Sequence, residues 1–217
     1  MATTESLLPS DRFGAMWREL GAMGPAHETF ERLRAAYEEA HRAYHGARHI
    51  AACLRLLDEP SVRALAEHAA EIEGALWFHD AIYDTHAADN EERSAALARD
   101  SLRSAGVADD VAARVAAHIE ATKSHVATSP DGQLVIDIDL SILGAPRSTF
   151  DAFEEKIREE YRWVDTPLYV AGRTAVLRRF AERPFIYGTP LFRARFEATA
   201  RANISTALER LGREAVL

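Results

Sequence analysis

The spacing of apolar residues constrains the fold of this chain more than any other feature. Between residues 27 and 44, for example, apolar side chains recur at intervals of three and four, which is the period of one face of an amphipathic helix. They are Phe30, Leu33, Ala36 and Tyr37. Only the run QLVIDIDL at 133–140 alternates briefly as a strand would, and we interpret it as a loop and a short helix. The sequence therefore predicts an all-α fold.

Gly, Pro, Asp and Ser mark the ends of the expected helices, because these residues cap or interrupt helical backbone. After Pro60 we expect a long Ala- and Glu-rich helix that ends in ALWFHDAIYD. The other expected helices cover residues 11–23, 27–44, 47–57, 90–104, 108–122, 148–163, 168–183 and 190–212.

No repeat, low-complexity tract or long linker divides the 217 residues, so we expect one domain. Its core is expected at about residues 26–145 and a helical extension at about 146–217. The net charge of −8 disfavours a nucleic acid polymer or an anionic membrane as partner and leaves a homodimer open. The chain has one cysteine, Cys53, and shows neither a secretory leader nor an uninterrupted apolar stretch of about 18 residues. We therefore expect a cytoplasmic protein.

Three groups of residues suggest a metal site. His45 and His49 are four residues apart, so on a helix both imidazoles would lie on one face. The doublet His79 and Asp80 follows the apolar residues ALWF, where burial is costly unless a metal or a hydrogen-bond network compensates. For the same reason, one of two carboxylates in the run VIDIDLSILG is expected to be a ligand; they belong to Asp137 and Asp139.

The remaining histidines carry weaker signals. Those at positions 27, 41, 68 and 86 are interpreted as solvated or structural residues. His118 and His125 are seven residues apart, nearly two helical turns, and would be co-facial if the helix continued through Lys123. Asp84 lies four residues after Asp80 and would face the same side of a continuing helix.

The order of His49, the His79-Asp80 doublet and a late Asp before a Leu resembles the HD superfamily of metal-dependent phosphohydrolases. The motifs YHGARHI, WFHDAIYD, NEERSA, IEATKSH, DIDLSILG, IREEY, GRTAVLRRF and IYGTPLF extend the resemblance over about residues 40–207. They are most similar to a bacterial subgroup of HD-type phosphohydrolases without an assigned substrate. The resemblance implies an HD-domain-like helical bundle with a C-terminal helical extension.

The same resemblance implies the ligands of the metal. It assigns His49, His79, Asp80 and Asp139 to a divalent ion such as Mn, Mg, Ni, Zn or Fe, with Asp139 preferred to Asp137 because it precedes a leucine. His45 would then lie beside the ligands. Where members of the superfamily bind two metals, additional histidines take part, and His125 is the candidate in this chain.

Two His nitrogens and two carboxylates would leave coordination positions for a water that attacks phosphorus. A nearby carboxylate would act as general acid or base, and the candidates are Asp84, Glu91 and Glu92, with Asp84 favoured by its spacing. Phosphate requires cationic partners, and the candidates for substrate binding are Arg48, Lys123 and Arg173, together with His45. The sequence thus predicts a metal-dependent hydrolase of a small phosphate ester or nucleotide.

Two alternatives remain open. One is a di-iron oxygenase of the HD type, in which His118 and His125 bind a second iron. The other is a ligand-binding HD module without catalytic activity. The sequence does not separate a nucleotide, a cyclic dinucleotide, a sugar phosphate and an inorganic phosphate chain as substrates.

Overall fold

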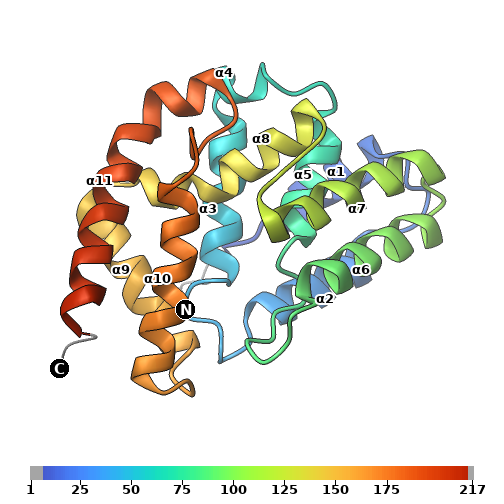
Figure 1. Cartoon of the computed structure of the whole chain (residues 1–217). Helices are drawn as coiled ribbons and strands as arrows, with labels where there is room; N and C mark the ends of the chain where they lie inside the picture. The colour runs from blue at the N-terminus through green and yellow to red at the C-terminus, as the bar shows by residue number, and fades with distance from the viewer. Residues whose placement is uncertain (1–6, 215–217) are drawn as a thin grey trace, which may run out of the picture. The chain divides into compact units, whose positions relative to one another are not determined.

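The computed structural model describes residues 7–214, and over this range the secondary structure is helical without strands. The all-α prediction is confirmed (Figure 1). The helices are α1 (Ser10–Glu19), α2 (His27–Tyr37), α3 (Ala47–Asp58), α4 (Pro60–Arg63), α5 (Ala69–Phe78), α6 (Asn90–Ser104), α7 (Asp109–Ser124), α8 (Pro130–Asp139), the 3₁₀ helix η1 (Leu140–Gly144), α9 (Arg147–Glu160), α10 (Thr166–Ala181) and α11 (Pro190–Glu214). Among these described residues, no helix combines the length and apolarity needed to cross a bilayer.

The helices form two compact units, one ending at Ile138 and the other beginning at Asp139. The boundary falls before the last residue of α8, close to the expected start of the helical extension at about residue 146. The organisation as a single domain stays a prediction.

Helix α5 is the centre of the first unit and contacts α1, α3, α6 and α7. Every residue from Glu71 to Phe78 is buried, so α5 has no solvent-facing side over this stretch. Its two acidic residues lie against arginines of neighbouring helices: Arg12 binds Glu73 at 2.8 Å, and Arg114 donates two hydrogen bonds to Glu71, at 2.8 and 2.7 Å. These pairs allow carboxylates to be buried in an apolar core.

In the second unit, η1 packs on α11 and α9, and α10 packs on α11. The approach of η1 to α11 is close, because a Cβ atom at Gly144 would lie 2.6 Å from the Cβ of Phe196. The side-chain amide of Asn203 donates to the carbonyls of Leu143 and Ala145, each at 2.9 Å. A glycine is therefore required at position 144 by packing.

The expected helix 11–23 ends early, at Glu19, and two other expected helices differ more from the prediction. The expected helix 27–44 ends at Tyr37, and the long helix after Pro60 is divided into α4 and α5. The division lies where the Asp131 carboxylate accepts the backbone N–H groups of Glu67 and His68, each at 2.8 Å. A side chain distant in sequence thus stabilises non-helical backbone that local propensity alone does not predict. The run at 133–140, expected as loop and short helix, is helical throughout in α8 and η1.

Candidate metal centre

Three ligand atoms converge at the C-terminal end of α5. The Nε2 atoms of His49 and His79 are 3.1 Å apart, and the Oδ2 atom of Asp80 lies 3.1 Å from the His79 Nε2 and 3.6 Å from the His49 Nε2. Ligands bound at about 2.1 Å to one ion lie about 3.0 to 3.4 Å apart at octahedral or tetrahedral angles. The two separations of 3.1 Å fall in this range, and the 3.6 Å between His49 and Asp80 is slightly longer, so small side-chain movements would let the three atoms share one metal ion.

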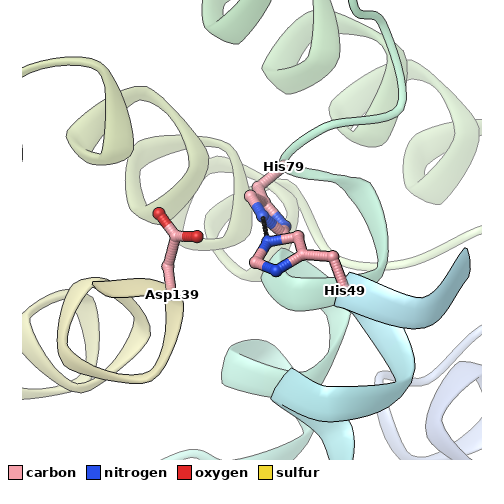
Figure 2. A group of neighbouring side chains, drawn as sticks. All are labelled: His49, His79 and Asp139. Atoms are coloured by element: carbon pink, nitrogen blue, oxygen red, sulfur yellow. Dashed lines mark hydrogen bonds between the residues drawn. The ribbon is translucent and has the colours of Figure 1, made fainter. Parts of the chain in front are cut away.

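Asp139, the last residue of α8, forms a group with the same two histidines. One ligand atom each from His49, His79 and Asp139 lies within 4.8 Å of the others, and the group could hold a metal ion (Figure 2). We call His49, His79, Asp80 and Asp139 the His–Asp cluster.

The helical conformation of α8 separates Asp137 from Asp139, because two residues on a helix differ by about 200° around its axis. Asp137 is fully buried and accepts a hydrogen bond from the side chain of Gln133 at 3.0 Å. Asp139 is the carboxylate that joins the two histidines. The role of Asp139 as a metal ligand stays a prediction.

The His79 ring is held in the tautomer that a metal ligand requires. Its Nδ1 lies 3.0 Å from the carbonyl oxygen of Leu76, which can only accept, so Nδ1 carries a hydrogen. In the neutral ring, Nε2 then presents a lone pair. That lone pair faces the Asp80 oxygen at 3.1 Å, and two acceptors at this separation repel each other unless a proton on Nε2 or a metal ion lies between them. The donor set therefore fits a metal ion.

The Asp80 carboxylate supports the same conclusion. Its Oδ2 atom is buried and accepts no hydrogen bond within the described part of the chain. Burial would raise the pKa of this carboxyl, but His79, His45 and His49, when their imidazoles are protonated, outweigh burial and hold the pKa below its ordinary value. Asp80 is therefore ionised, as a metal ligand must be.

Four carbonyl groups at the end of α5 each accept a hydrogen bond from a side chain. The Nδ1 of His79 donates to the carbonyl of Leu76, and the Tyr37 hydroxyl donates to the carbonyl of Trp77 at 2.8 Å. Arg42 donates to the carbonyls of Asp80, at 2.5 Å, and Ala81, at 3.1 Å. These carbonyls would otherwise be unsatisfied at a helix end. The backbone that carries the doublet is thus held by Tyr37 and Arg42.

Sequence analysis missed Arg42 as a functional residue. Its side chain is 1% exposed, and its guanidinium also donates to the carbonyl of His45 at 3.0 Å and lies over the rings of Tyr37 and Tyr83. A usable signal was present, since Arg42 lies three residues before His45 and follows Tyr37, the last of the apolar residues that define the expected helix. Such a residue is a positioning residue, because it contacts the backbone of the doublet and not the ligand atoms.

The helical spacing expected for two candidate residues is wrong. Helix α3 begins at Ala47, so His45 precedes the helix that carries His49; its ring stacks on Tyr83 with centroids 4.3 Å apart. Helix α5 ends at Phe78, so no helix connects Asp80 to Asp84. Asp84 is exposed and accepts a hydrogen bond from the backbone N–H of His86 at 2.9 Å, which lowers its pKa below the ordinary value. The catalytic role of Asp84 stays a prediction, and the helical spacing from Asp80 no longer supports it.

The other candidates for catalysis and substrate binding lie on exposed or paired positions. Glu92 and Lys123 form an exposed ion pair with each other, and Lys123 also donates to the carbonyl of Ala88 at 2.7 Å. Arg48 is exposed beside His49. In the second unit, the buried carboxylate of Glu154 binds Arg173, whose Nε lies 3.2 Å from it. The charge of Arg173 is therefore already balanced.

His118 and His125 do not form the co-facial pair expected from their spacing. Helix α7 ends at Ser124, and His125 is its C-cap residue in the left-handed conformation, with φ of 53°. His118 is buried and lines a cleft at the N-terminal end of α5, and burial lowers its pKa. Since α5 is about 15 Å long, His118 gives no support to a second iron beside His79. A metal-binding role for His125 stays a prediction.

Comparisons with models of known protein families, with curated proteins and with solved structures found no match to this chain. The functional assignment therefore depends on the geometry and chemistry of the His–Asp cluster.

Proposed function

We propose that this protein is a metal-dependent phosphohydrolase of the HD type. The observation that carries the proposal is the convergence of the His49 Nε2, the His79 Nε2 and the Asp80 Oδ2 within 3.1 to 3.6 Å of one another. Two imidazoles and carboxylates suit Mn²⁺, Ni²⁺, Zn²⁺ or Fe²⁺, and such a set leaves coordination positions for water and substrate.

A divalent ion bound there would supply Lewis acidity, lowering the pKa of a water and polarising a phosphoryl oxygen. The chain's own residues set the geometry. His79 presents Nε2 because Leu76 holds its Nδ1 hydrogen, and the low pKa of Asp80 keeps its carboxylate charged at neutral pH. Arg42 and Tyr37 hold the backbone of the doublet, so these ligand atoms need little reorganisation on binding.

The proposed substrate class is a small phosphate ester or nucleotide. Arg48 is the cation adjacent in sequence to a cluster residue, and its exposed side chain leaves it available to bind a phosphate oxygen. We also propose that the enzyme is cytoplasmic, because its single cysteine, Cys53, cannot form a disulfide within the chain.

The test begins with the metal content of the purified full chain. Nucleotides, sugar phosphates, cyclic dinucleotides and polyphosphate are then assayed for phosphate release with Mn²⁺, Mg²⁺, Ni²⁺ and Zn²⁺. We expect hydrolysis of at least one class. Asp80→Ala should abolish it and reduce bound metal, because the change removes a charged ligand. Asp100→Ala, an exposed aspartate on α6, is the matched control and should change neither.

Two results would refute the proposal. An Asp80→Ala protein that keeps both its metal and its activity would exclude any mechanism based on the doublet. A coloured iron protein that consumes O₂ and cleaves no phosphate ester would favour the di-iron oxygenase.

A further inference from the structure

A second group of possible metal ligands lies at the opposite end of α5 from His79. Glu67 and His68 precede the first turn of α5, and Asp131 is the second residue of α8. One ligand atom from each of these three residues lies within 4.8 Å of the other two. All three belong to the first unit, and none belongs to the His–Asp cluster.

Asp131 is the fixed member of this group. It is 3% exposed, and its two oxygens accept the backbone N–H groups of Glu67 and His68. The Nδ1 atom of His68 lies 3.2 Å from its Oδ2, a separation that two ligands of one ion also show. Each carboxylate oxygen has two lone pairs, so Oδ1 retains one for a further partner. The exposed side chains of Glu67 and His68 can move toward an ion held by Asp131.

These residues line a cleft of about 500 Å³, which we call the α5 cleft. Its charged lining consists of four carboxylates and one guanidinium: Glu67, Glu71, Glu120, Asp131 and Arg114. Arg114 is bound in bidentate fashion by Glu71 and also by Asp110. The remaining negative charge therefore favours a cation over an anion such as phosphate.

An independent observation comes from His118 on α7, which lines the same cleft. The residue is 5% exposed, and its Nε2 is buried without a hydrogen-bond partner in the described part of the chain. Gly132 makes room for the ring, since a Cβ atom there would lie 3.0 Å from the His118 Nδ1. A buried polar nitrogen without a partner is costly unless a ligand or an ion satisfies it.

We propose that Glu67, His68 and Asp131 form a second metal site, with His118 as the buried fourth ligand. The mixture of imidazole and carboxylate selects a transition-metal dication of the Zn²⁺ type, because Mg²⁺ and Ca²⁺ prefer oxygen ligands alone. Such an ion would join the start of α5 to α7 and α8. It would thus brace the helices whose opposite ends carry His79 and Asp139, a structural role separate from the proposed hydrolysis.

The experiment counts the Zn²⁺ equivalents that the full, metal-stripped chain binds, by titration against a chelating dye, and records the melting temperature. We expect two equivalents for the wild type and one for His68→Ala, because its imidazole is 54% exposed and its removal leaves the core intact. Glu67→Gln should also lose the second equivalent. The His79→Ala variant should lose the other one.

The matched control is His27→Ala, since His27 is an exposed histidine next to a glutamate, Glu28, and lies outside both sites. It should bind two equivalents, and the variants at the exposed positions 27, 67 and 68 should melt in EDTA within a few degrees of the wild type. Zn²⁺ should raise the melting temperature of His79→Ala but raise that of His68→Ala less than that of the wild type.

Three outcomes decide between the sites. If His68→Ala binds as many equivalents as the wild type, the second site does not exist and the contact with Asp131 is an ordinary ion pair. If the wild type binds one equivalent and only the His79→Ala variant loses it, the second site is overturned and the proposed function stands. If the wild type binds one equivalent and only the His68→Ala variant loses it, the second site is supported and metal binding at the His–Asp cluster is refuted.

Discussion

Replacing Arg42 by lysine tests whether the backbone of the doublet must be held in place. The guanidinium donates to the carbonyls of Asp80, Ala81 and His45, and its side chain is 1% exposed. Each such bond from a charged donor contributes roughly 1.5 to 3 kcal/mol. A lysine ammonium can replace one of these bonds but lacks the planar fork that makes them all at once. Losing two predicts a decrease of about 3 to 6 kcal/mol in the free energy of unfolding.

The same change should also weaken metal binding, by about 10- to 100-fold, because Arg42 acts on the metal through the residues that carry the ligands. The free energy of unfolding is measured by urea unfolding in EDTA. Metal affinity is measured without urea, well below the melting temperature, by competition with a chelating dye. The matched control is Arg34→Lys, whose exposed guanidinium binds Glu31 and Glu38; neither quantity should change. An Arg42→Lys protein that loses stability but binds metal as tightly as the wild type would refute the positioning role.

Three further predictions concern single side chains. Asp139→Asn should lower metal affinity by about 10-fold or more, whereas Asp137→Asn should leave it unchanged, because only Asp139 joins the two histidines; competition titration measures both. Burial lowers the pKa of His118, so in EDTA the free energy of unfolding should fall as the pH drops from about 6.5 toward that lowered pKa. The urea midpoints at pH 7.5 and pH 5.5 should therefore differ less in His118→Gln than in the wild type. A general acid or base at Asp84 predicts about a 100-fold lower turnover in Asp84→Ala with metal retained. Its exposure and its hydrogen bond to His86 lead us to expect less than a tenfold loss, and steady-state rates will decide.

Apolar periodicity was enough to predict the fold class and most helices. The segments at 47–57, 90–104 and 108–122 correspond closely to α3, α6 and α7. Periodicity failed where distant side chains bind backbone groups. The break before α5 depends on Asp131, and the end of α5 depends on Tyr37 and Arg42. No local pattern reveals such partners, which lie about 40 to 60 residues away.

The residue types of the candidate site were also readable from the chain, since the two histidines and the carboxylates stood in apolar surroundings where burial demands a partner. By itself the sequence therefore indicated which side chains, if buried, require a polar or charged partner. Only the tertiary structure decided which of them meet. It brought Asp139 and not Asp137 to the histidines, since α8 is helical, and separated His118 from them by the length of α5. Convergence of ligand atoms depends on the relative placement of helices, which is set by packing among residues distant in the chain.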